Sequence, residues 1–171
     1  MKVVSLFSGA GAFEKALTNL GIEHEVVGFS EIDKYAITSY CAIHGVDKEL
    51  NLGDITAINH EDVPDCDLIT FGFPCQPFSL AGKGLGFEDD RGNMFFEAFR
   101  IIKHKLPKYF IFENVQGLLH HDKGRTIETV LEYLGMLPYE ITMDLLNSKD
   151  FGTLQNRSRL FCIGRRLDDA K

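Results

Sequence analysis

A cysteine held between two prolines is the residue of this sequence best suited to covalent chemistry. Cys75 lies in the stretch GFPCQPFSLAG, with Pro74 before it and Pro77 after it. Proline fixes φ and removes a backbone donor, so the two rings restrict the directions in which the thiol can point. A buried structural cysteine is the commoner role of this residue type, but so constrained a loop favours a thiol aimed at a substrate.

Three charged side chains could assist that thiol. The motif FEN ends a strand-like run and places Glu113 as a plausible general acid beside a nucleophile, the alternative being a polar strand end. In QNRSR, Arg157 and Arg159 are two residues apart, so an extended chain points both to the same side. Paired guanidinium groups suit a phosphate or a base carbonyl, although a solvated basic edge is the plain alternative.

Glycines and carboxylates near the N-terminus indicate a binding site for a small molecule. In FSGAGAFEKAL, Gly9 and Gly11 lie in a turn before a helix, where the backbone can approach a ligand closely. Glu31 in SEID follows a second strand, and Asp54 in GDIT follows a third, weaker one. Each alone reads as a turn or a solvated carboxylate. Together they would lie at the carboxyl ends of three consecutive strands, which favours an adenosine-type pocket.

Short apolar runs alternate with helical patterns along the chain, which predicts βα units in a mostly parallel sheet. Besides the weak third strand, the predicted strands are KVVSLF, EVVGF, DLITFG, KYFIFEN, YEITMDLLN with one wet face, and LFCIG. The predicted helices carry Phe13, Ala16, Leu17 and Leu20 up to Gly21; Ile37, Tyr40 and Cys41 after a cap at Asp33; Phe95, Phe99 and Ile102 before Pro107; and Ile127, Val130, Leu131 and Leu134.

Composition limits the class of protein. The length of 171 residues suits one domain, residues 1–171, and no apolar run is long enough to span a membrane, so an intracellular protein is expected. A net charge of −7 argues against bulk attraction to nucleic acid, although residues 155–171 carry five basic side chains against two acidic ones. Without any C-x-x-C pair, neither a metal site nor a disulfide is expected, and Cys41, Cys66 and Cys162 are interpreted as structural thiols.

Taken in order, these motifs resemble those of the cytosine-C5 DNA methyltransferases. FSGAG resembles the cofactor loop of that family, GFPCQPFS its catalytic loop, ENV the motif of the catalytic glutamate, and QNRSR its Q-x-R-x-R motif. SEID and GDIT match the intervening cofactor positions, and RGNMFFEAFRII resembles the helix before ENV. The resemblance covers nearly the whole chain and implies a Rossmann-like α/β methyltransferase domain with an antiparallel strand near the C-terminus.

The resemblance also implies roles for individual residues. Cys75 would attack C6 of a flipped-out cytosine in double-stranded DNA, Glu113 would protonate N3, Arg157 and Arg159 would hold the base and its backbone, and Asn114 would help fix the loop. S-adenosylmethionine would be the cofactor and S-adenosylhomocysteine its product. Phe13 and Ile32 would sandwich the adenine, Glu31 would bind the ribose and Asp54 the adenine amino group. The full set of expected cofactor residues is Phe7, Gly9, Gly11, Phe13, Glu31, Ile32, Asp54, Ile55 and Pro74.

The sequence departs from the family pattern in two ways. Ser5 and Ala12 stand where the family usually has aspartate and a further glycine. The chain also ends at Lys171, before the family's target-recognition region, a further motif and a final helix. We therefore expect an apolar face left uncovered and a second polypeptide that carries the recognition region, or self-association. Methylation of transfer RNA and a non-catalytic regulatory role remain as alternatives.

Overall fold

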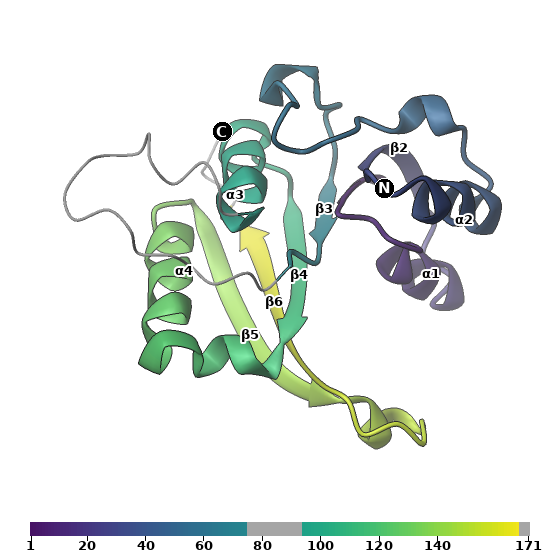
Figure 1. The fold of residues 1–171 in the computed structure, drawn as a ribbon. Coiled ribbons are helices and arrows are strands. Elements are labelled where there is room, and N and C mark those ends of the chain that lie inside the picture. The colour runs from purple at the N-terminus through teal and green to yellow at the C-terminus, as the bar shows by residue number, and fades with distance from the viewer. Residues whose placement is uncertain (75–93, 168–171) are drawn as a thin grey trace.

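The computed structural model describes residues 1–74 and 94–167, and the predicted nucleophile Cys75 lies outside this part of the chain (Figure 1). Six strands form one sheet in the order β2-β1-β3-β4-β6-β5. Neighbours among β2, β1, β3 and β4 pair in parallel, whereas β6 is antiparallel to both β4 and β5. The elements are β1 (Lys2–Leu6), α1 (Ala12–Asn19), β2 (Glu25–Ser30), α2 (Lys34–His44), β3 (Leu68–Phe71), α3 (Met94–Lys105), β4 (Tyr109–Val115), α4 (Arg125–Gly135), β5 (Tyr139–Asn147) and β6 (Ser158–Arg166). The predicted α/β fold with an antiparallel strand near the C-terminus is confirmed.

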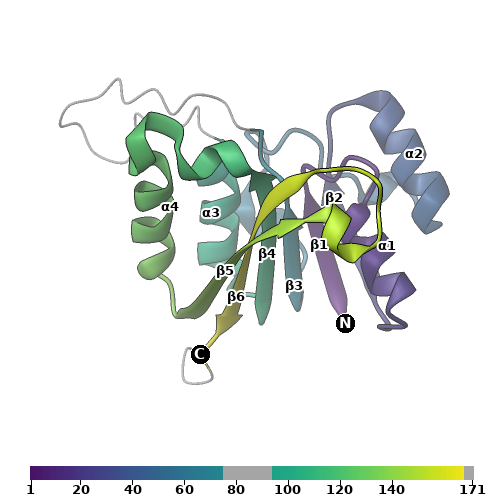
Figure 2. The same cartoon turned by 90° about the horizontal axis from the view of Figure 1, so that it is seen from below.

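The strand register gives the sheet two different faces. Aliphatic and aromatic side chains of β1, β3 and β4 meet α3 and α4 on one face, where Leu6 pairs with Phe71 and Phe71 with Phe112. Helices α1 and α2 lie on the other face (Figure 2). There the strands present Ser5 and Thr70 beside Phe29, and Phe29 stacks on Tyr40 of α2 with ring centroids 4.5 Å apart.

Helix α3 follows the predicted catalytic loop and is the most deeply packed helix of the described chain. Its predicted apolar residues Phe95, Phe99 and Ile102 are all buried. The last turn carries Lys103, His104 and Lys105, whose basic character complements the negative end of the helix dipole.

Two expectations about the N-terminal half were wrong. Among the described residues, no strand lies between β2 and β3, and Asn51 forms only an isolated parallel bridge with Phe29. The segment is held by turns and by side-chain hydrogen bonds as well as by one backbone bond to Phe29, so the weak apolar pattern was insufficient for a strand. In α1, the apolar stripe is not the buried side: Leu20 is 73% exposed, whereas Glu14 is fully buried.

The C-terminal hairpin is longer than its sequence pattern predicted. The strand expected over LFCIG extends over Ser158–Arg166 and pairs with β4 from Arg165 opposite Tyr109 to Arg159 opposite Val115. Because β6 runs antiparallel to β4, its first residues meet the carboxyl end of β4. The β5–β6 hairpin extends beyond the other strands on the side of α1 (Figure 2).

The register of β6 depends on a glycine. Gly164 lies opposite Phe110, and a Cβ at position 164 would come within 2.1 Å of the phenyl ring. Since Phe110 is fully buried, it has no room to withdraw. We predict that Gly164→Ala lowers the free energy of unfolding by about 1–3 kcal/mol through overpacking, measured by chemical denaturation. Gly135→Ala, whose Cβ would meet open space, is the control, and an equal loss in both variants would contradict the prediction.

Candidate active site

The turn after β1 adopts a backbone conformation that favours glycine. Gly9 and Gly11 have φ of 52° and 75°, and Phe7, which is not a glycine, has φ of 52°. The Ser8 amide donates to the carbonyl oxygen of Ser30 at 3.1 Å, which ties the turn to the end of β2. The positive φ of Phe7 costs conformational energy, and the surrounding contacts must hold the residue in this conformation. Residues with such backbone conformations cluster at functional sites.

Glu31 is the acidic group that organises this turn. One carboxylate oxygen accepts a hydrogen bond from the Gly9 amide at 2.9 Å. The other accepts from the amides of Ile32 at 2.8 Å and Asp33 at 3.0 Å. A carboxylate has about four acceptor positions, so Glu31 retains capacity for a ligand hydroxyl group. Asp33, as predicted, caps α2 by accepting from two backbone amides of its first turn.

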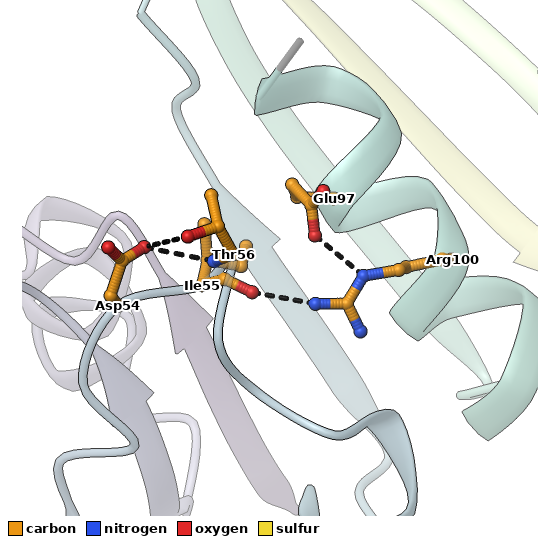
Figure 3. A network of polar contacts seen from close by, with 5 residues as sticks. All are labelled: Asp54, Ile55, Thr56, Glu97 and Arg100. Atoms are coloured by element: carbon orange, nitrogen blue, oxygen red, sulfur yellow. Dashed lines mark hydrogen bonds and ion pairs between the residues drawn. The ribbon is translucent and has the colours of Figure 1, made fainter. Parts of the chain in front are cut away.

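Asp54 is a negatively charged group on the irregular segment beside β2. Its Oδ1 accepts hydrogen bonds from the Thr56 amide at 2.9 Å and the Thr56 hydroxyl at 2.8 Å (Figure 3). These bonds, the backbone one first, hold the pKa of Asp54 below its usual value, so the side chain is ionised at neutral pH. Asp54 is exposed, whereas the Ile55 side chain is buried in the core and leaves only its backbone for a ligand.

A buried polar cluster lies between α1 and the sheet and was not predicted. The Thr70 hydroxyl lies 3.1 Å from Glu14 Oε1 and 3.2 Å from Ser5 Oγ, and all three residues are buried. Glu14 Oε2 has no hydrogen-bond partner among the described residues. Ser5 thus occupies this cluster with a small hydroxyl, where the aspartate usual in the family would add a second carboxylate beside Glu14. A polar residue inside the periodic pattern of α1 was the only sequence signal.

Glu113 and Arg159 form an ion pair where β4 and β6 meet. Arg159 Nε lies 2.6 Å from Glu113 Oε1, with side chains 21% and 27% exposed. Glu113 also borders the end of β3, because a Cβ at Gly72 would come within 3.5 Å of Glu113 Oε2. Such a charge-assisted bond fixes the orientation of the carboxylate while leaving part of it accessible.

Two pockets adjoin this ion pair. One, of about 570 Å³, lies between α1 and the β5–β6 hairpin and has Phe13, Glu113, Arg157 and Arg159 among its lining residues. The other, of about 530 Å³, is lined by residues 115–117 and 155–159. Arg157 and Arg159 line both pockets.

The structure does not bring all predicted cofactor residues together. Phe13 lines the pocket of Glu113, and the walls of that pocket do not include Ile32, which is 74% exposed beyond β2. Phe7 and Glu31 directly follow Leu6 and Ser30, the residues that pair at the ends of β1 and β2. Pro74 is exposed at the last described position before Cys75.

Two observations bear on the predicted nucleophile. Asn114 Nδ2 donates to the carbonyl oxygen of Phe73 at 3.0 Å, which anchors the chain two residues before Cys75. Burial raises the pKa of the Cys66 and Cys162 thiols to about 12, so both stay protonated at neutral pH. Cys41, Cys66 and Cys162 are free thiols.

Comparison with known proteins identifies the family. The profile described as C-5 cytosine-specific DNA methylase matches residues 1–171. The chain belongs to this family. Within it, the chain is 54% identical over 168 residues to an orphan methyltransferase, M.Rho11sI, of Bacillus phage rho11s, covering 98% of this chain and 33% of that protein. It is 48% identical over 167 residues to the type II methyltransferase M1.ScrFI of Lactococcus lactis subsp. cremoris, covering 95% and 41%.

This member of the C-5 cytosine-specific DNA methylase family therefore spans about a third to two fifths of the length of these two relatives. Among solved structures, it is similar to the S. pombe Dnmt2 methyltransferase, with a TM-score of 0.79, 28% identity, and coverage of 97% of this chain and 51% of that one. The predicted Rossmann-like methyltransferase fold is confirmed by this similarity.

The two glycines of the turn differ in their surroundings, which gives a matched test. A Cβ on Gly11 would come within 2.1 Å of the His44 ring and 2.8 Å of Tyr40, whereas a Cβ on Gly9 would meet nothing within 4 Å. Positive φ costs each alanine variant roughly 1–2 kcal/mol. We predict that Gly11→Ala loses about 1–3 kcal/mol more than Gly9→Ala, measured by denaturant unfolding. Equal stabilities would mean that α2 does not confine the turn.

Proposed function

We propose that the chain is the S-adenosylmethionine-binding catalytic domain of an enzyme that methylates C5 of cytosine in double-stranded DNA. The observation that carries the proposal is the Glu113–Arg159 ion pair, which faces a pocket bordered by the helix after the glycine turn. The site combines an oriented carboxylate and two arginines with the neighbouring glycine turn. This combination suits a flipped base bound next to the adenosyl group of a cofactor. The family match and the methyltransferase names of the phage and bacterial relatives support the same reading.

The residues around the glycine turn fit S-adenosylmethionine chemically. The position of a Cβ on Gly9 is open, so a ligand can approach the backbone there. Glu31 has acceptor capacity for ribose hydroxyls, and the ionised Asp54 can accept from the adenine amino group. We assign Phe7 rather than Phe13 as the aromatic partner of Ile32 at the adenine, and Phe13 to the pocket of Glu113. When bound, this cofactor supplies an electrophilic methyl group on a sulfonium.

The proposed chemistry activates the base before it reacts. Cytosine C5 is a weak nucleophile because the ring is aromatic and electron-poor. The Cys75 thiolate would add to C6 while Glu113 holds a proton at N3, which converts the base to an enamine that is nucleophilic at C5. Arg159 would keep the Glu113 carboxyl group oriented towards the base. C5 would then bond the transferable methyl group, and loss of the C5 proton, return of the N3 proton to Glu113 and departure of the Cys75 sulfur would restore the aromatic ring.

Base recognition requires more than the described residues offer. A cytosine inside a stacked duplex is inaccessible, so it must be flipped out at a cost of a few kcal/mol that protein contacts offset. Arg157 and the polar pocket of residues 115–117 and 155–159 would hold the flipped nucleotide and its phosphates. We propose that a target-recognition segment, carried by a second polypeptide or supplied by self-association, covers the apolar part of the Glu113 pocket that Phe151 and Phe161 line.

We predict transfer of labelled methyl groups from S-adenosylmethionine to cytosine in unmethylated DNA. The assay uses the chain with and without a recognition segment from a relative, and with RNA in parallel. Cys75→Ser should abolish transfer, and Glu113→Gln should lower it about 10²–10⁴-fold, since positioned proton transfer contributes that much. Cys41→Ser serves as a matched control that should retain activity.

Three results would contradict this proposal. Methyl transfer to RNA with none to DNA would establish the alternative substrate. Full activity of Cys75→Ser would remove the covalent mechanism. Absence of transfer to either nucleic acid by the folded chain, with the recognition segment supplied, would favour the regulatory role.

A further inference from the structure

The segment that carries Asp54 leaves the sheet after a short bridge to β2. Its bridge to β2 ends where the Leu52 amide donates to the carbonyl oxygen of Phe29 at 2.6 Å. Beyond that point, Asp54 lies on an irregular backbone with no strand pairing among the described residues. The Ala57 amide donates to the Asp54 carbonyl oxygen at 2.9 Å and Thr56 binds the carboxylate, so the turn is fixed locally, and contacts with other elements must set where the turn lies.

The two carbonyl groups that flank Asp54 are each held by a different element. The Ser30 hydroxyl, at the end of β2, donates to the carbonyl oxygen of Gly53 at 2.7 Å. Arg100 Nη2, on α3, donates to the carbonyl oxygen of Ile55 at 2.6 Å (Figure 3). Asp54 thus lies between two carbonyl groups that are held by two different elements, β2 and α3.

Arg100 is itself oriented before it reaches the loop. Its Nε donates to Glu97 Oε2 at 2.6 Å, one turn earlier on α3 (Figure 3). The Glu97 side chain is 8% exposed and that of Arg100 is 30% exposed. The planar guanidinium group of Arg100 thus donates to two acceptors at fixed angles. The flexible ammonium group of a lysine cannot reproduce this geometry.

We infer that Arg100 and Ser30 are positioning residues that set the Asp54 carboxylate for the adenine amino group of the cofactor. Neither residue is placed in contact with the cofactor, and both act through Asp54. The inference rests on the proposed function, because it concerns the affinity and the selectivity of the proposed adenine site. It adds that α3, the helix that follows the catalytic loop, also determines how well adenine is recognised.

The test measures binding of two ligands by calorimetry on the full chain. One is S-adenosylhomocysteine, and the other is its purine analogue without the 6-amino group. Arg100→Met and Ser30→Ala should each weaken binding of the adenosyl ligand about five- to tenfold, because a displaced acceptor loses a hydrogen bond made by a charged group. Binding of the analogue should change less than twofold.

A double-mutant cycle separates positioning from a general structural effect. In an Asp54→Ala background, Arg100→Met should cause no further loss of affinity, because the group through which it acts is absent. Arg100→Lys should give an intermediate affinity, since one ammonium can replace one of the two bonds. Arg125→Met is the matched control: Arg125 also pairs with an acidic residue three positions earlier, Asp122, and its loss should leave both affinities unchanged.

The outcomes distinguish the inference from the function on which it rests. Equal weakening of both ligands, or a full additional loss in the Asp54→Ala background, would overturn the inference while leaving the proposed function intact. Should Arg100→Met fail to fold, the Ser30→Ala variant and its cycle with Asp54→Ala decide the question in the same way. Failure of the unsubstituted chain to bind S-adenosylhomocysteine would instead overturn the proposed function, and the inference with it.

Discussion

The ion pair between Glu113 and Arg159 depends on one antiparallel strand. Parallel strands deliver their carboxyl ends to the same edge of a sheet, which brings the glycine turn, Glu31 and Glu113 to that edge. An arginine at the amino end of another parallel strand would lie at the opposite edge. Because β6 runs the other way, its first residues reach the end of β4, where Arg159 meets Glu113 at 2.6 Å. The reversal of this strand thus places cation and carboxylate together.

The cofactor side of the site depends on a different constraint, which is backbone conformation. Phe7, Gly9 and Gly11 adopt positive φ angles within five residues, and the Glu31 and His44 side chains contact the backbone of this turn. Glu31 binds the Gly9 amide in front, and the Ser5–Glu14–Thr70 cluster lies buried behind α1. Burying a second carboxyl group beside Glu14 would be costly, whereas Ser5 adds only a small hydroxyl group to the cluster. This arrangement accounts physically for the departure at position 5.

Local patterns predicted the elements well where burial is periodic. The stripe Phe95, Phe99 and Ile102 faces the core as expected, and Asp33 caps its helix. The pattern failed where non-local polar contacts replace apolar packing. In α1 the stripe of Phe13 and Leu20 is not the core side, because the sheet presents Ser5 and Thr70 to that helix.

Residues that act through others gave no signal in the sequence. Arg100 sits in a helix whose charged residues normally face solvent, and only the folded chain shows that its guanidinium reaches the Ile55 carbonyl 45 positions earlier. The third strand was predicted from the local pattern but does not form. The side chains of Asn51, Ser30 and Arg100 make hydrogen bonds there in place of strand pairing, and nothing in the sequence indicated these contacts. The motifs identified the side chains proposed to take part in the reaction, but not the contacts that orient those side chains.

The most direct test of the proposed mechanism is covalent trapping. A duplex that contains 5-fluorocytosine blocks the loss of the C5 substituent, so the sulfur that attacks C6 stays attached to the base. The complex would be formed with S-adenosylmethionine and the recognition segment present, then digested and mapped by mass spectrometry. We predict a single adduct on Cys75, consistent with the raised pKa of the buried Cys66 and Cys162 thiols. An adduct on another cysteine, or methyl transfer to ordinary DNA without any adduct, would contradict the account.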